Sequence, residues 1–283
     1  MTLLAALQEA TRRLAAGGVA RPRLEAEVLL SRACNLTRPG LLARLEEGLA
    51  PAAAQFFWPA VDRRAAGYPL QYLTGHQEFM SLDFRVTPAV LIPRQDTEVV
   101  VEAVLERLHP DGEYTIADCG TGSGAIALSL AHYLPRARVY ATDISPAALA
   151  VARQNARELG LAARVTFYQG DFLAPLQGLK FHALVANPPY IPAADLAGLP
   201  ADVRWEPRLA LDGGPDGLDA YRVLLPGGAR LLRPGGLLAL EIGCAQGQAV
   251  MSLAAATGAY RDRQILPDYA GRPRCFLAHR REE

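Results

Sequence analysis

Apolar residues recur at helical spacing from Thr2 to about Arg64. Leucine and valine side chains return every three or four positions within several separate runs, as expected for helices that bury one face. Pro22, Pro39 and Pro51 fall between the runs. Because proline is tolerated at the start of a helix and breaks its interior, each proline marks a new helix. The pattern predicts a bundle of four or five helices over residues 1–74, with no cluster of reactive side chains in it.

Between residues 75 and 92 the apolar positions recur at every second residue and no longer at helical spacing. Two stretches that alternate apolar and polar positions, Glu78–Leu82 and Asp83–Val86, meet near Ser81. Alternation over so few residues favours strands, and Ser81 lies near the expected turn. We expect a β-hairpin that links the helical bundle to the rest of the chain.

From residue 93 to residue 283, short apolar runs alternate with helical patterns, which is typical of an α/β domain whose parallel sheet has helices on both faces. Ser145 is a good N-cap for one of the helices. The strands are expected at Tyr114–Asp118, Arg138–Thr142, Arg164–Tyr168, Phe181–Ala186, Leu237–Glu241 and, as a late edge strand, Cys275–His279. The helices are expected at Asp96–Leu108, Ala125–Tyr133, Pro146–Leu159 and Leu218–Leu232.

A glycine-rich turn joins the first of these strands to an apolar helix. It reads Asp118-Cys119-Gly120-Thr121-Gly122-Ser123-Gly124. Glycines let a ligand approach the backbone, and Asp143, about twenty residues further on, can accept hydrogen bonds from both hydroxyls of a ribose. The combination predicts a nucleotide-like cofactor but does not choose it. The spacing Gly120-x-Gly122-x-x-Ala125 also satisfies a relaxed dinucleotide pattern, which leaves NAD open.

A third acidic residue follows the third strand in Gly170-Asp171-Phe172. The Asp171 carboxylate can accept from the exocyclic amine of an adenine, and the Phe172 ring can cover a face of the base. Taken alone, Asp171 is equally consistent with a helix cap. Its position in register with Asp118 and Asp143 favours an adenine-binding role, and NAD-binding folds do not require a third acidic residue at this point.

The most specific feature is Asn187-Pro188-Pro189-Tyr190, directly after the strand Phe181–Ala186. The prolines fix the backbone and carry no N–H, so the turn presents carbonyl acceptors, and the Asn187 amide oxygen adds another. Such acceptors can hold the N–H bonds of an amide or an aromatic amine and direct the nitrogen at the methyl group of S-adenosyl-L-methionine. Tyr190 is expected to pack against the flat acceptor group. The alternative, a proline-stiffened turn capped by Asn187, leaves the upstream glycine turn unexplained.

Composition narrows the possible partners. Lys plus Arg and Asp plus Glu are equal at 29 each, so the chain lacks the net positive charge that supplies non-specific affinity for nucleic acid. The four cysteines form no C-x-x-C pair and the histidines lack metal-ligand spacing, so we expect neither disulfides nor a metal site. The chain shows no pattern of a secretory signal and no apolar run that could span a bilayer, and we expect a cytoplasmic protein.

Three further segments carry a resemblance to a known family. The glycine turn and Asn187–Tyr190 are shared by amino-group methyltransferases of DNA, RNA and protein. The chain also contains P-L-Q-Y-L-x-G-x-x-E-F from Pro69, L-I-P-R-x-D-T-E from Leu91 and E-P-x-x-A-L-x-G-G-x-D-G from Glu206. Together these segments resemble the release factor glutamine methyltransferase family, from the first helices to the last strand.

The resemblance implies a Rossmann-like class I methyltransferase domain with a mostly parallel seven-stranded sheet, and a helical bundle that docks the release factor. It implies methyl transfer from S-adenosyl-L-methionine, leaving S-adenosyl-L-homocysteine, to the side-chain amide nitrogen of the glutamine in the Gly-Gly-Gln loop of class I peptide chain release factors. The release factor would be the protein partner of a monomer, with no direct nucleic-acid or membrane partner.

The resemblance also implies roles for individual residues. The family often has a tryptophan where this chain has Phe172, and phenylalanine keeps the ring face but not the indole N–H. Catalysis and amide binding would fall to Asn187, Pro188, Pro189 and Tyr190. The cofactor-binding residues would be Asp118, Gly120, Thr121, Gly122, Ser123, Gly124, Asp143, Asp171, Phe172 and Asn187.

Other residues near this site keep two interpretations. Pro93, Arg94 and Glu98 either shape the edge of the cofactor pocket, or Arg94 and Glu98 form an ordinary ion pair four residues apart on a helix. Glu241, at the end of the fifth expected strand, either lies at the rim of the site or, as we expect, is a surface acid before the turn at Gly243.

Two other functions stay compatible with the motifs. An N6-adenine methyltransferase of DNA or RNA would hold a flipped adenine in the same acceptors, but the balanced charge and the lack of an added recognition domain disfavour it. A catalytically silent cofactor-binding protein that docks through its helices is disfavoured by the intact Asn187-Pro188-Pro189-Tyr190.

Overall fold

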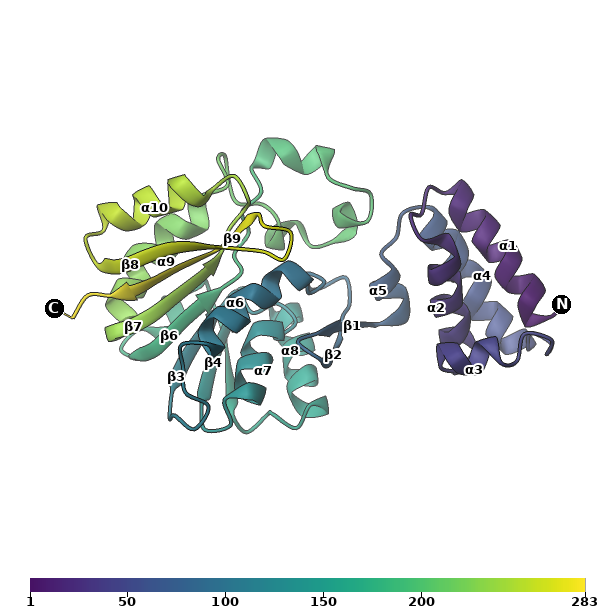
Figure 1. Ribbon diagram of the computed structural model, residues 1–283, viewed down its shortest axis with the longest axis horizontal. Coiled ribbons are helices and arrows are strands. Elements are labelled where there is room, and N and C mark those ends of the chain that lie inside the picture. Colours follow the sequence, from purple (N-terminus) through teal and green to yellow (C-terminus); the bar gives the residue numbers. More distant parts are fainter. Residues whose placement is uncertain (283) are drawn as a thin grey trace. The chain divides into compact units, whose positions relative to one another are not determined.

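The computed structural model describes residues 1–282, which form two compact units (Figure 1). The smaller unit contains Met1–His76 and, from much later in the chain, Pro200–Trp205. The larger unit contains Gln77–Leu199 and the described residues from Glu206 onward. Residues 77–92, expected as a linker, lie in the larger unit in this division.

The smaller unit is a bundle of five helices, as predicted. Pro22, Pro39 and Pro51 each lie in the first turn of a helix, where the missing N–H costs no hydrogen bond. The indole of Trp205 packs edge-on against the ring of Tyr68, with ring centroids 5.2 Å apart. The helices are α1 (Leu3–Ala16), α2 (Pro22–Cys34), α3 (Arg38–Leu42), α4 (Pro51–Ala65) and α5 (Leu70–Thr74).

The larger unit contains the predicted seven-stranded sheet, in the order β5-β4-β3-β6-β7-β9-β8. Neighbouring strands from β5 to β7 are parallel, and β9 runs antiparallel to both β7 and β8. The strands are β3 (Thr115–Cys119), β4 (Arg138–Asp143), β5 (Val165–Gln169), β6 (Phe181–Ala186), β7 (Leu232–Glu241), β8 (Tyr260–Pro267) and β9 (Pro273–Arg280).

The C-terminal part of the sheet corrects the sequence analysis. The stretch Cys275–His279 was expected at an edge, but β9 lies between β7 and β8, and β8 is the edge strand. The strand β8 was not predicted, because Arg261, Asp262 and Arg263 interrupt its apolar pattern, as is usual for a strand with one solvent-facing side. The helix α10 (Gly247–Ala256) was not predicted either.

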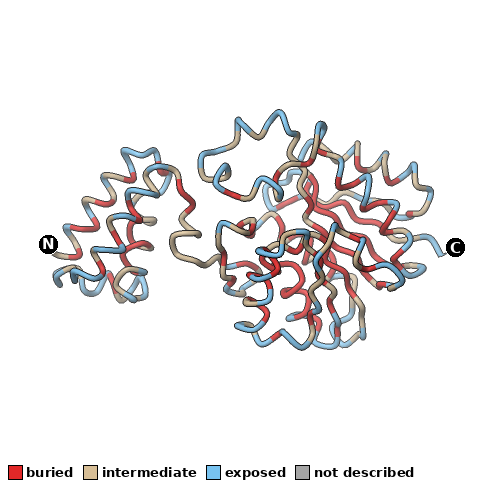
Figure 2. Tube along the Cα trace, turned by 180° about the vertical axis from the view of Figure 1, so that it is seen from behind, coloured by how far each residue is buried: buried red, intermediate tan, exposed pale blue. Residues whose placement is uncertain are grey.

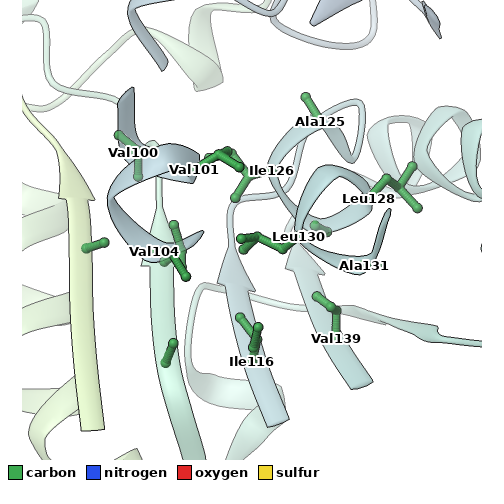
Figure 3. Close-up of a cluster of buried hydrophobic side chains, with 14 of the residues drawn as sticks. Val100, Val101, Val104, Ile116, Ala125, Ile126, Leu128, Leu130, Ala131 and Val139 are labelled. Carbon is green, nitrogen blue, oxygen red and sulfur yellow. The ribbon is translucent and has the colours of Figure 1, made fainter. Parts of the chain in front are cut away.

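Helices cover both faces of the sheet. On one face lie α6 (Gln95–Leu105), α7 (Ala125–Tyr133) and α8 (Pro146–Glu158), and Figure 3 shows Val104 of α6 and Leu130 of α7 above Ile116 of β3. On the other face lie α9 (Asp219–Leu231) and α10. Figure 2 shows buried residues running along the central strands. Burial on both faces explains why these strands are almost continuously apolar.

The predicted hairpin consists of β1 (His76–Phe79) and β2 (Leu82–Arg85). Its turn lies at Met80 and Ser81, inside the first expected stretch Glu78–Leu82. Both turn residues have positive φ, 50° and 58°, as tight hairpin turns require. The Glu98 side chain on α6 accepts a hydrogen bond of 2.7 Å from the Met80 N–H. Phe79 and Phe84 join the hydrophobic core of the larger unit. The hairpin is therefore packed into this unit.

Candidate active site

The glycine turn lies at the carboxyl end of β3, as predicted. Gly120, Gly122 and Gly124 have φ of 78°, 56° and 84°, a left-handed conformation that favours glycine. The N–H groups of Gly120 and Thr121 both donate to the Thr142 carbonyl, at 2.9 and 2.8 Å, which ties the turn to β4. A Cβ atom at Gly122 would meet nothing within 4 Å. The backbone is therefore open to a ligand at that point.

Asp118 holds this turn in place through hydrogen bonds. Its side chain is fully buried, and its Oδ2 accepts from the Thr121 hydroxyl at 2.6 Å and from the Ala127 N–H at 3.1 Å. Burial raises the pKa of the Asp118 carboxyl to about 7, against the lowering effect of these two hydrogen bonds. Asp118 thus connects β3, the turn and the start of α7.

Asp143, at the end of β4, holds the other side of the turn. Its Oδ2 accepts from the Gly122 N–H and its Oδ1 from the Ser145 N–H, each at 2.9 Å. Each carboxylate oxygen has a second lone pair left for a further donor. The Ser145 hydroxyl caps α8 by accepting from the Ala148 N–H, as predicted.

Phe172 is held in an uncommon conformation beside the turn. Its φ is 38°, in the left-handed region that a residue with a side chain rarely adopts. The Thr142 hydroxyl donates to the Phe172 carbonyl at 2.7 Å, and the ring lies 3.4 Å from where a Cβ atom of Gly120 would be. Strain of this kind persists only when the surrounding contacts impose it, and it is concentrated at functional sites.

These residues surround a cavity of about 270 Å³ in the larger unit. Of the predicted site residues, Asp118, Gly124, Pro188 and Tyr190 are absent from its lining. The predicted residues that line it are Gly120, Thr121, Gly122, Ser123, Asp143, Asp171, Phe172, Asn187 and Pro189. Residues that the sequence analysis did not assign complete the wall, including Val90, Leu91, Thr97, Ile144, Leu209 and Asp212. The cavity joins the ends of β3, β4, β5 and β6, where parallel α/β sheets bind their ligands.

Asn187 presents its side chain to this cavity from the end of β6. Its Nδ2 donates to the Thr97 hydroxyl oxygen of α6 at 3.2 Å. Because the two N–H bonds and the Oδ1 atom lie at opposite corners of the amide, this bond leaves Oδ1 available as an acceptor on the other side. Pro189 lines the same wall.

The Tyr190 side chain points into the protein. Its hydroxyl donates to Glu241 Oε1 at 3.2 Å and accepts from Arg274 Nη1 at 3.4 Å. Glu241 is only 2% exposed, so the expectation of a surface acid is wrong. Burial raises its pKa to about 7, and hydrogen bonds from Thr97 and Tyr190 and the charge of Arg274 oppose that shift. The carboxylate lies directly behind the Asn187–Tyr190 turn.

The segment Leu211–Gly217, called the return segment below, forms backbone hydrogen bonds with the residue just after Tyr190. The Ile191 N–H donates to the Leu211 carbonyl at 3.0 Å, and the Gly213 N–H donates to the Ile191 carbonyl at 2.8 Å. Gln246 links the two segments, since its Nε2 donates to the carbonyls of Tyr190 and Gly217 at 2.9 and 3.0 Å. No local signal marked Gln246, because its role depends on segments far apart in sequence.

Arg94 and Glu98 do not pair with each other, so the ordinary helical ion pair is not formed. Arg94 pairs instead with Glu206, which also accepts from the Ile92 N–H at 2.9 Å. The Glu206 side chain is 1% exposed. Two of the family-like segments, one around Arg94 and one starting at Glu206, are thus joined in the structure, and Pro93 lines the cavity.

Within residues 1–282, no group of three or more His, Cys, Asp or Glu side chains is arranged to hold a metal ion. No described helix has the length and apolar character needed to cross a bilayer.

Two family models match the chain. The PrmC N-terminal domain matches residues 5–75, and the methyltransferase small domain matches residues 94–197. The chain is 84% identical to the release factor glutamine methyltransferase of Moorella thermoacetica over 283 residues, which cover 100% of both chains. It is 48% identical to the release factor glutamine methyltransferase of Geobacter sulfurreducens over 246 residues, which cover 87% of this chain and 85% of the relative.

The fold is also similar to that of solved methyltransferases. The structure of the T. thermophilus 16S rRNA N2 G1207 methyltransferase in complex with AdoMet and guanosine matches with a TM-score of 0.53 and 20% sequence identity. The match covers 73% of this chain and 50% of that chain. At this level of identity the similarity concerns the fold alone.

Proposed function

The chain belongs to the family of release factor glutamine methyltransferases, and on that premise we propose how its residues bind the cofactor and the glutamine side chain. The protein is an enzyme that methylates release factors with a cofactor of the AdoMet type. The observation that carries the assignment of the site is the position of Asn187, whose amide oxygen is free to accept beside the glycine turn.

The cavity fits S-adenosyl-L-methionine by the chemistry of its lining. The Asp143 carboxylate would accept from the ribose hydroxyls with the lone pairs that Gly122 and Ser145 leave free. The Phe172 ring would cover a face of the adenine, and the Asp171 carboxylate would accept from its amine. The open backbone at Gly122 would allow the close approach of the methionine end. When bound, the cofactor supplies a methyl group on a positively charged sulfur.

The residues of the Asn187–Tyr190 turn would bind the substrate amide. An amide nitrogen is a weak nucleophile because its lone pair is delocalised. Asn187 Oδ1 and the proline-fixed carbonyls would accept from its N–H bonds, hold the nitrogen toward the methyl group and stabilise the positive charge that grows on it. Pro188 and Pro189 fix the backbone, since neither can rotate about φ. Tyr190 would hold the turn through Glu241.

We propose that the acceptor is the glutamine of the Gly-Gly-Gln loop of class I release factors and that the product cofactor is S-adenosyl-L-homocysteine. Two findings support this. The residues proposed to bind the acceptor all belong to the larger unit, while the smaller unit matches the PrmC N-terminal domain. The names of the relatives specify a glutamine of a release factor.

The test is mass spectrometry of a purified class I release factor after incubation with the enzyme and S-adenosyl-L-methionine. We expect one added methyl group on the loop peptide, assigned to the glutamine by fragmentation. A release factor with alanine in place of that glutamine is the matched control and should gain no methyl group. Absence of the methyl group on the unmodified loop, or transfer of labelled methyl to adenine in duplex DNA or RNA instead, would overturn the proposal.

A further inference from the structure

Thr142, near the end of β4, holds two parts of the cofactor cavity at once. Its backbone carbonyl accepts from the N–H groups of Gly120 and Thr121, at 2.9 and 2.8 Å. Its side-chain hydroxyl lies 2.7 Å from the carbonyl oxygen of Phe172. Thr142 is fully buried and is absent from the lining of the cavity. The glycine turn and Phe172 therefore depend on different atoms of one buried residue.

The bond between the Thr142 hydroxyl and the Phe172 carbonyl can form in only one direction. A carbonyl oxygen carries no proton, so the hydroxyl donates and the carbonyl accepts. Among residues 1–282, no second donor to this carbonyl is found. Because the carbonyl lies in the plane of the peptide bond that follows Phe172, the hydroxyl restrains the orientation of that plane. Loss of the hydroxyl would leave the carbonyl without its partner and the plane without this restraint.

The chain on either side of Phe172 is held by other contacts. The Gly170 N–H donates to the Asp143 carbonyl at 3.0 Å, and the Leu173 side chain is buried in the core on one face of the sheet. Phe172 connects these two fixed points with a φ of 38°, which is unfavourable for a residue with a side chain. Such a conformation persists only when a contact imposes it, and the Thr142 hydroxyl supplies that contact.

The backbone conformation of Phe172 also determines where its ring lies, because the bond from Cα to Cβ turns with the backbone. The ring lines the cavity and lies 3.4 Å from where a Cβ atom of Gly120 would be. Thr142 holds the glycine turn through its carbonyl and the ring through its hydroxyl. The position of the ring relative to the glycine turn is therefore set from a single residue.

We propose that Thr142 is a positioning residue for the adenine end of the cofactor, and that its hydroxyl keeps the Phe172 ring in place before the cofactor binds. The proposal rests on the proposed role of Phe172 in covering the adenine. A ring that is already in place binds a ligand more tightly than one that becomes ordered on binding, because ordering costs conformational entropy. Since Thr142 does not line the cavity, its hydroxyl acts on the cofactor through Phe172.

The first test uses two variants of the full chain. Thr142→Val keeps the shape of the side chain and removes the hydroxyl, whereas Thr142→Ser keeps the hydroxyl. We expect Thr142→Val to weaken the binding of S-adenosyl-L-homocysteine about fivefold to tenfold in calorimetry, the usual effect of losing one hydrogen bond. Thr142→Ser should stay within about twofold of the wild type. A wild-type Kd in Thr142→Val, or equal losses in both variants, would overturn the proposal.

A double-mutant cycle with Phe172→Ala tests the route of the effect. If the Thr142 hydroxyl acts through the Phe172 ring, Thr142→Val should weaken S-adenosyl-L-homocysteine binding much less when the ring is already absent. Losses in Kd that multiply would show that Thr142 reaches the cofactor by another route, and the proposal would fail.

Hydrogen–deuterium exchange measured by mass spectrometry, without any ligand, provides a readout that does not depend on cofactor or release factor. We expect faster exchange in the peptide that contains residues 170–176 in Thr142→Val, but not in Thr142→Ser. The peptide that contains residues 118–124 is the internal control, because valine retains the backbone carbonyl to which Gly120 and Thr121 donate. Unchanged exchange in residues 170–176 would overturn the proposal, and so would equally faster exchange in both peptides. Failure of the proposed function would leave this result as it is, so the two failures can be distinguished.

Discussion

Gly213→Ala should slow methyl transfer although Gly213 does not line the cofactor cavity. Gly213 lies in the return segment, and a Cβ atom there would sit 2.8 Å from Tyr190 Cα and 2.9 Å from Gly217 Cα. Both contacts are with backbone, which cannot rotate away as a flexible side chain can. The φ of Gly213 is not positive, so alanine would meet a steric conflict and no conformational strain.

The size of the effect follows from the displacement required. Ordinary van der Waals contact begins at 3.4 Å, and the Cβ atom would lie at 2.8 Å, so the chain at Tyr190 must move by about 0.6 Å. A misplacement of about 1 Å can cost about a hundredfold in rate. We therefore expect kcat to fall by about tenfold to a hundredfold, or about 1.4 to 2.7 kcal/mol. Affinity for S-adenosyl-L-homocysteine should change little, because Gly213 does not line the cavity.

The assay is initial-rate methylation of release factor, with calorimetric titration of S-adenosyl-L-homocysteine and a thermal melt to confirm that each variant is folded. Gly198→Ala is the matched control, because it lies in the same connection, has no positive φ and would meet nothing within 4 Å. It should retain wild-type kcat. An unchanged kcat in Gly213→Ala, or an equal loss in Gly198→Ala, would show that the return segment does not position Tyr190.

Three further predictions concern single residues. Asn187→Ala should lower kcat by about a hundredfold or more, as loss of one transition-state hydrogen bond does, with little change in the Kd for S-adenosyl-L-homocysteine; an equally weakened Kd in calorimetry would contradict its role as acceptor. Phe172→Ala should weaken S-adenosyl-L-homocysteine binding by about 1 to 3 kcal/mol, the usual value for stacking of a base on an aromatic ring. An unchanged Kd would show that the adenine does not stack on Phe172. Burial raises the pKa of Asp118 from 3.8 to about 7, so the neutral carboxyl stabilises the fold at low pH and that contribution is lost as pH rises through 7. The melting temperature of the wild type should therefore fall relative to that of Asp118→Asn as the pH rises from about 4 to about 7, and a difference that stays constant over this range would refute the shift.

The parts of the site that the sequence revealed are those formed by consecutive residues. The glycine turn, Asp143 and Asn187–Tyr190 each follow directly from a buried strand, and parallel strands bring their carboxyl ends to one edge. Periodicity and local motifs were sufficient to find them. The strand and helix pattern of residues 93–241 was recognised for the same reason, since both faces of its sheet are buried and apolar.

The supporting residues could not be found in that way. Thr97, Glu241 and Gln246 contact the Asn187–Tyr190 turn from α6, β7 and the residue before α10, each more than fifty residues away in the chain. A lone Glu241 before a glycine looks like a surface acid until the fold shows that it is buried. The edge strand β8 was missed because its solvent-facing positions hide the apolar ones. The role of each of these residues depends on contacts between segments that are far apart in the chain, and a single sequence does not show such contacts.

The placement of Pro200–Trp205 makes the smaller unit a discontinuous domain. A fragment that ends at His76 would lose Trp205 and uncover the ring of Tyr68, whereas a fragment that begins at Gln77 would carry Trp205 without the ring it packs against. The protein therefore cannot be divided into its two folded halves by a single cut. Either half made alone would be an incomplete version of the domain it is meant to represent.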